Sequence, residues 1–172
     1  MRRRIKSNAY TLIELLIVIA AIAILLTITV LSLKTAENSA KANKIITSML
    51  NIKMAFQVAY INNQDTFDKA KDNYTNGKLL ELSTISKYLD NMNAADAGKY
   101  QLLYYNKSGD RKGWWVRYTF GNDSYELRSE LADRIFNEPE LGILSYKSEG
   151  NIGGADKKNI ASTNLYLIMK IR

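Results

Sequence analysis

Glu14 is the first residue whose type and surroundings suggest chemistry, because it is an acid inside an apolar stretch. It lies between Leu12-Ile13 and Leu15-Leu16, and residues 15–33 carry no charge. An ionised side chain costs about 2.5–3.5 kcal/mol at the middle of a membrane and less toward its ends. Two interpretations of Glu14 are open. It is either a carboxylate near the lipid headgroups, stabilised by the positive end of a helix dipole, or an acid with a functional partner.

A second group of acids lies nearer the C-terminus, in a segment that also contains several glycines. Its members are Glu138, Glu140, Glu149 and Asp156. Carboxylate oxygens suit calcium, but the spacing of these residues does not match a compact calcium loop such as an EF-hand. We therefore treat the four acids as weak metal candidates, and a solvated acidic loop is the simpler interpretation.

The residue types that the chain lacks exclude much catalytic chemistry. It has no Cys and no His, which excludes disulfides, thiolate metal sites and Ser-His-Asp triads. The glycines at 150, 153 and 154 lack the Lys-Ser/Thr pair that completes a phosphate-binding P-loop. We therefore expect neither an enzyme nor a bound cofactor.

The positive charge of the chain is concentrated at one end. The formal net charge is +7, and residues 1–9 contribute four basic residues and no acid, whereas residues 61–172 contain 16 basic and 15 acidic residues. A nucleic-acid-binding domain usually carries a clustered basic face, so we do not expect this one to bind nucleic acid. Tyr104, Tyr105, Trp114 and Trp115 are the aromatic candidates for DNA or glycan binding, although core packing explains them more simply.

Residues 15–33 are long enough to cross a membrane as a helix, since about 20 residues span the hydrocarbon core. The positive-inside rule keeps residues 1–9 in the cytoplasm, which predicts a single-pass protein of the cytoplasmic membrane with its C-terminus outside. A cleaved secretory signal fits less well. The apolar core of a secretory signal is normally about 7–15 residues, which is shorter than the run at residues 15–33. The possible cleavage site at residues 40–42 also lies well beyond the end of this run. An uncleaved signal anchor fits the span but leaves Glu14 unexplained.

The residues around Glu14 favour a third interpretation. Residues 8–20 read NAYTLIELLIVIA. With the basic leader before it, this run closely resembles the N-terminal signature of type IV pilins and pseudopilins. In that signature a small residue ends the leader, and an aromatic residue, Thr-Leu-Ile-Glu-Leu and an apolar helix follow. The resemblance is close over residues 1–34 and looser over 35–172. It implies a structural subunit of a type IV pilus or pseudopilus, which leaves the membrane to join a filament outside.

The resemblance also implies roles for three residues and several partners. A prepilin peptidase would cut between Ala9 and Tyr10 and would N-methylate Tyr10. Glu14 would pair with the terminal amine of Tyr10 on an identical or related neighbouring subunit, because neither charge is tolerated alone in an apolar bundle. A membrane platform protein and an assembly ATPase would act on the polymer.

Two departures from the family pattern matter. Ala9 stands where the family usually has Gly, so cleavage is expected to be slower. No Pro interrupts the apolar helix near residues 30–32, which predicts a continuous helix and favours a minor pilin or a pseudopilin. Two alternatives stay open, namely a competence pseudopilin that takes up DNA and a signal-anchored exported binding domain.

The predicted helix continues beyond the span. No Gly or Pro occurs in residues 34–60, and one stripe with spacings of four and three is formed by Ile45, Met49, Ile52, Phe56 and Ala59. This stripe predicts burial against a globular head. The chain is thus expected to have four parts: a basic leader (1–9), an apolar half-helix (10–33), an amphipathic half-helix (34–60) and a head (61–172).

The head is expected to be rich in strands, so the predicted fold class is α+β, a long helix packed on a small antiparallel sheet. Residues 100–105 and 165–171 are apolar strand candidates, and residues 114–120 alternate between two faces. Residues 125–128 are expected to form a hairpin with 114–120. We further expect a helical turn at 130–136, a short helix or turn at 79–89 and a linker at 61–78.

Overall fold

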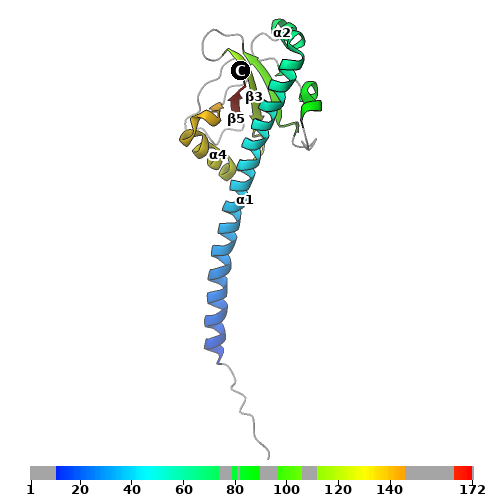
Figure 1. Cartoon of the computed structure of the whole chain (residues 1–172). Coiled ribbons are helices and arrows are strands. Elements are labelled where there is room, and N and C mark those ends of the chain that lie inside the picture. The colour runs from blue at the N-terminus through cyan, green and yellow to red at the C-terminus, as the bar shows by residue number, and fades with distance from the viewer. Residues whose placement is uncertain are drawn as a thin grey trace, which may run out of the picture. The chain divides into compact units, whose positions relative to one another are not determined.

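The computed structural model describes residues 11–73, 79–80, 82–89, 97–105, 112–145 and 165–171. The chain divides into two compact units, Met1–Glu37 and Asn38–Arg172. Figure 1 shows the elements, which in chain order are α1 (Leu12–Asn62), α2 (Gln64–Asn73), β1 (Leu79–Leu80), the 3-10 helix η1 (Leu82–Tyr88), β2 (Tyr100–Tyr105), β3 (Gly113–Thr119), α4 (Tyr125–Asn137), the 3-10 helix η2 (Pro139–Leu141), β4 (Ile143–Ser145) and β5 (Tyr166–Lys170).

The first unit contains the apolar part of α1. All its described residues, 11–37, are exposed, and this part of α1 is long and apolar enough to cross a membrane. The hydroxyls of Thr27 and Thr29 donate to the carbonyls of Ala23 and Leu25 at 2.9 and 2.8 Å. Such bonds satisfy the hydroxyls of these two threonines without water. No residue near 30–32 breaks the helix, as expected from the absence of Pro.

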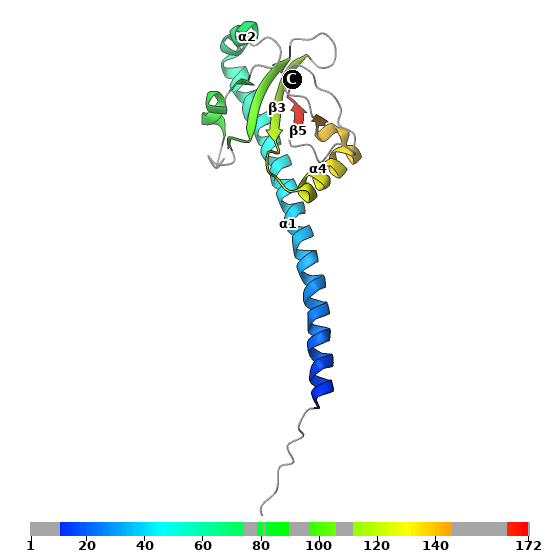
Figure 2. The same ribbon diagram turned by 180° about the vertical axis from the view of Figure 1, so that it is seen from behind.

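The second unit is built on one antiparallel sheet with the strand order β1-β2-β3-β5-β4. β2 pairs along its whole length with β3, from Tyr100 opposite Tyr118 to Tyr105 opposite Gly113. On its other edge β3 pairs with β5, and β5 pairs with β4. Figure 2 shows β3 and β5 side by side. The fold class is therefore α+β, as predicted.

The main core lies between one face of this sheet and the second half of α1. Ile45, Met49, Ile52, Phe56 and Ala59 are all buried there, which confirms the predicted stripe. The Phe56 ring lies 5.0 Å from that of Trp114 on β3, centroid to centroid. Because side chains alternate along a strand, Trp114, Val116 and Tyr118 face this core. The predicted two faces of the strand are thus confirmed.

The opposite face of the sheet carries a smaller buried cluster, whose members are Leu103, Tyr105, Trp115 and Ile168. Arg117 lies on this face too, and its guanidinium carbon is 4.6 Å from the centre of the Tyr166 ring. Its Nε also donates to Gln101 Oε1 at 3.2 Å. The cross-strand pairing of Gln101 with Arg117 brings the two side chains together.

The expected strand at residues 125–128 is wrong, because these residues begin helix α4. Ser124 caps the helix, and its Oγ accepts the N–H of Leu127 at 3.2 Å. Leu127, Leu131 and Ile135 then repeat every four residues and enter the same core as α1. Four alternating residues are too few to outweigh a helical repeat of this length. The expected turn at 130–136 is part of the same helix, and β5 takes the place beside β3.

Two further differences concern residues 61–89. Residues 64–73 form α2, although we expected a linker. Phe67 is buried with its ring centre 5.0 Å from that of Phe56, and the Tyr60 hydroxyl donates to Asp68 Oδ1 at 2.7 Å. These contacts with α1 hold a polar segment helical. Within the expected short helix or turn at 79–89, residues 82–88 form the 3-10 helix η1. Residues 79–80 differ from the expectation, because they form strand β1, which pairs with β2.

Candidate functional site

The N-terminus of α1 is closed by two residues that bond to each other. Thr11 precedes the first helical residue, and its Oγ1 accepts the N–H of Glu14 at 3.3 Å. Glu14 Oε2 in return accepts the backbone N–H of Thr11 at 2.8 Å. The sequence Thr-x-x-Glu and this reciprocal geometry define a capping box, which satisfies two N–H groups that the helix itself leaves without partners.

The carboxylate of Glu14 is only partly used by this cap. The Thr11 hydroxyl also donates to Oε2, at 2.8 Å. None of the three hydrogen bonds of the cap involves the second carboxylate oxygen, Oε1. Oε1 has no hydrogen bond to any residue in the described part of the chain. The next residues of α1 are apolar and exposed, among them Leu12, Ile13 and Leu15. In lipid this oxygen would therefore be available to a cation that another molecule brings.

A family model described as the prokaryotic N-terminal methylation motif matches residues 4–30. Residues 4–30 are the prepilin-type cleavage and methylation motif of the type IV pilin family. No curated protein matches the chain, and no solved structure matches it either. The motif supports a type IV pilin-like or pseudopilin precursor, and it implies processing by prepilin peptidase and assembly into pilin polymers.

The motif also accounts for the apolar half of α1. Together, the motif and this helix fit a pilin anchored in the inner membrane. Pilin-family proteins that carry the motif are structural and are not enzymes. Of the three motif residues for which we predicted roles, the structure describes only Glu14. Ala9 and Tyr10 lie outside the described residues.

The four acidic metal candidates are not brought together as far as the structure describes them. Glu138 and Glu140 are exposed at η2, and Glu149 and Asp156 lie outside the described residues. Within the described ranges no three His, Cys, Asp or Glu residues form a group that could hold a metal ion. The metal site stays an untested prediction.

The aromatic candidates lie in the packed layers of the second unit. Tyr104 and Trp114 are buried in the main core, and Tyr105 and Trp115 are buried on the opposite face of the sheet. Each is at most 6% exposed, so these four side chains offer no platform for a base or a sugar. The core-packing interpretation is confirmed.

Sequence reasoning missed two features. The role of Thr11 as the cap of α1 is written in the spacing Thr-x-x-Glu before an apolar run, which is a recognised start signal for a helix. The second feature is a cavity whose lining includes Lys41, Lys44 and Lys99. No local signal reveals this cavity, because Lys99 is more than 50 residues from the other two in the sequence.

Proposed function

We propose that this chain is a structural subunit of a type IV pilus or pseudopilus that polymerises through its N-terminal helix. Prepilin peptidase would cut between Ala9 and Tyr10 and methylate the new terminal amine. The observation that carries the proposal is the methylation motif at residues 4–30, and the exposed apolar part of α1 supports it.

Glu14 would guide assembly through its unused oxygen. Cleavage creates a positive amine on Tyr10, which is as costly in an apolar bundle as the carboxylate of Glu14. An amine from a neighbouring subunit that reaches Oε1 neutralises both charges, while Oε2 keeps its bonds to Thr11. A buried pair of this kind contributes little net stability, but it selects one register between subunits.

The apolar helix would hold the subunit in the membrane until it enters the filament. Residues 1–9 would stay in the cytoplasm before cleavage, and the second unit would lie outside. A contact in which the same patch repeats head to tail propagates into a helical polymer instead of closing a ring. A platform protein and an assembly ATPase would drive extraction from the membrane. The unbroken helix through residues 30–32 favours a minor pilin or pseudopilin.

Mass spectrometry of the protein recovered from cell membranes tests this proposal. We expect a mature chain that starts at N-methylated Tyr10. A chain that retains Met1, or one that starts at Asn43 after the Ala40-Lys41-Ala42 sequence, would overturn the proposal. An Ala9→Gly variant serves as the comparison, because it restores the usual residue before the cut and should be processed at least as fast.

A further inference from the structure

The face of α1 that points away from the core carries an apolar ridge in the second unit. Leu50, Met54 and Val58 follow one another at intervals of four residues, and Ile61 comes three residues later. Residues at these intervals line up along one side of a helix. Each of the four side chains is between 38% and 75% exposed. Single exposed apolar side chains are common on proteins, but a contiguous row of them marks an interaction site.

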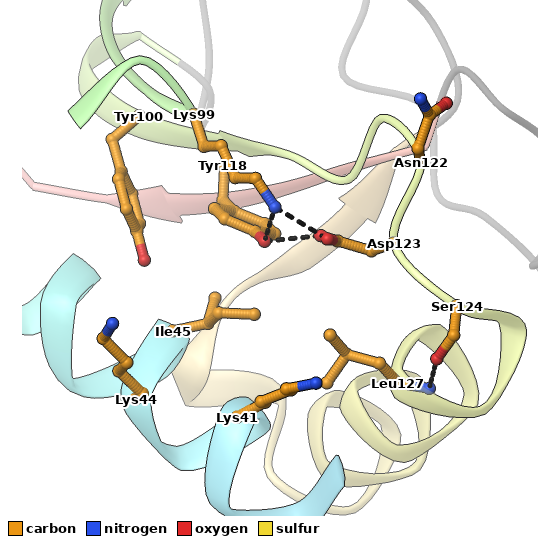
Figure 3. Close-up of a pocket in the computed structure, with 10 residues that line it drawn as sticks. All are labelled: Lys41, Lys44, Ile45, Lys99, Tyr100, Tyr118, Asn122, Asp123, Ser124 and Leu127. Atoms are coloured by element: carbon orange, nitrogen blue, oxygen red, sulfur yellow. Dashed lines mark hydrogen bonds and ion pairs between the residues drawn. The ribbon is translucent and has the colours of Figure 1, made fainter. Parts of the chain in front are cut away.

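The charged residues of this part of α1 lie away from the ridge. In the second unit they are Lys41, Lys44 and Lys53. Lys41 and Lys44 line the cavity between α1, β2, β3 and α4, and Figure 3 shows them across from Lys99. Lys53 is half-buried, and it is displaced about 100° round the helix from its neighbour Met54. The solvent-facing side of a surface helix is normally charged or polar, so an uncharged side with an apolar ridge is expected to be covered.

A groove runs beside the ridge, between α1 and the end of η1. It has a volume of about 380 Å³, and its lining residues are Asn51, Met54, Ala55, Val58, Tyr88 and Leu89. Met54 and Val58 belong to both features, so the ridge and the groove share an edge. The side-chain amides of Asn62 and Asn63 each donate to the Tyr88 hydroxyl at 3.4 Å, which ties the far wall of the groove to α1. Helices pack by placing the ridge of one in a groove of the other.

We infer that this face binds a second copy of the chain in a two-fold dimer, with the ridge of each copy in the groove of the other. A two-fold axis along the helices places every feature of one copy opposite its mirror position on the partner, so a ridge beside a groove meets a groove. An antiparallel pair would instead set ridge against ridge. The parallel pair is also the one that a membrane imposes, because two chains anchored by residues 11–33 both lead away from it in the same direction.

The size of the contact suits a dimer that forms only between anchored chains. Two patches of a few hundred Å² each bury less than the roughly 1,200 Å² of a stable soluble complex. A shared membrane raises the effective concentration of the two copies and restricts their orientation, which compensates for a small contact. The dimer therefore rests on the proposed function only for the membrane anchor. It is complete with two copies, so it holds subunits in a state distinct from the head-to-tail polymer.

Disulfide crosslinking of the purified full chain tests the dimer, because the chain has no Cys of its own. Met54→Cys with one affinity tag and Leu89→Cys with another are mixed in phosphatidylcholine vesicles and oxidised with copper phenanthroline. Only Cys residues whose Cα atoms come within about 7 Å join readily, so we expect a mixed dimer in about tenfold higher yield than from Met54→Cys with Tyr125→Cys. Tyr125 is exposed on α4 and lies outside the ridge and the groove, which makes it the matched control.

A charge on the ridge should remove the dimer. Val58→Glu in both tagged versions places two carboxylates in the contact, where they lose water and repel each other, so the yield of mixed dimer should fall about tenfold or more. Tyr125→Glu makes the same change away from the face and should leave the yield unchanged. Both side chains are exposed, so both variants should fold.

The inference is overturned if no mixed dimer forms in vesicles, if the control pair gives an equal yield, or if Val58→Glu crosslinks as well as the unchanged ridge. Crosslinking that occurs only in sheared filaments would assign the face to the polymer and would also overturn it. None of these measurements involves prepilin peptidase. A chain that is never cut after Ala9 would therefore remove the proposed function and leave the result for the dimer unaffected.

Discussion

The Thr11 hydroxyl donates to Glu14 Oε2 at 2.8 Å, and the same oxygen accepts the backbone N–H of Thr11 at 2.8 Å. One carboxylate oxygen therefore caps α1 from within the chain, while the other makes no hydrogen bond to a residue in the described part of the chain. The side chain that we propose to pair with a neighbouring subunit is thus also part of the cap of α1.

Thr11→Val should loosen the start of α1. Valine keeps the shape of threonine but cannot accept the N–H of Glu14 or donate to Oε2, and loss of an N-cap costs about 1 kcal/mol. Amide hydrogen exchange of residues 12–15 in detergent micelles should rise severalfold. Thr29→Val is the control, because its hydroxyl bonds to Leu25 in mid-helix. Unchanged exchange in the Thr11 variant would contradict the capping role.

Glu14→Gln should block filament entry while leaving membrane insertion intact. The amide oxygen can still accept the N–H of Thr11, but it no longer attracts the amine of Tyr10. Breaking one partner of a buried ion pair costs about 3–5 kcal/mol, so incorporation should fall to about one hundredth of wild type or less.

The measurement for Glu14→Gln compares the protein in sheared filaments with the protein in membranes. Glu37→Gln, which changes the next acid along α1, is the matched variant and should assemble normally. Normal assembly of the Glu14 variant would remove the proposed role of this carboxylate.

Phe56→Ala should destabilise the second unit by about 3–5 kcal/mol, because it leaves a cavity among Tyr60, Phe67 and Trp114. Met54→Ala on the same helix should change stability by less than about 0.5 kcal/mol, since Met54 is 56% exposed. Urea unfolding of the full chain in a nonionic detergent, followed by tryptophan fluorescence, measures both. Equal losses in the two variants would contradict the packing of α1 on the sheet.

Arg134→Ala should release α4 from α1. The guanidinium of Arg134 donates to Ser39 Oγ at 2.7 Å and to Asn43 Oδ1 on α1, and to Glu130 Oε1 at 2.9 Å on α4. Hydrogen bonds to charged groups contribute about 1.5–3 kcal/mol, and partial exposure places the expected loss near the lower value. Amide exchange in α4 should accelerate, while Lys69→Ala on α2 should leave it unchanged. Exchange at the wild-type rate would show that the apolar face of α4 is sufficient.

Gly142→Ala should destabilise the edge of the sheet. Gly142 has a backbone φ of 152°, which residues with a side chain rarely adopt. An added Cβ would also lie 2.7 Å from the carbonyl oxygen of Ile168. Strain of this kind costs about 1–3 kcal/mol, so Tm of the full chain should fall by several degrees. Gly98→Ala is the matched control, because no atom lies within 4 Å of its added Cβ. Equal Tm values for the two variants would refute the close approach of Gly142 to β5.

The sequence by itself was sufficient for several features that depend on neighbours along the chain. The uncharged run at residues 15–33, the acid at residue 14 and the stripe from Ile45 to Ala59 each follow from periodicity or composition in one continuous segment. Strand β3 was likewise predictable, because its alternation of two faces extends over seven residues.

Only the tertiary structure decided features that depend on residues far apart. Residues 125–128 alternate like a strand, yet Ser124 and the core contacts of Leu127 and Leu131 make them helical. α2 is polar, and its contacts with Phe56 and Tyr60 supply the burial that its composition lacks. The lysine-lined cavity joins Lys41 to Lys99 in the same way. The contacts of α2 and the lining of the cavity are set by energies between distant segments, which no local pattern encodes.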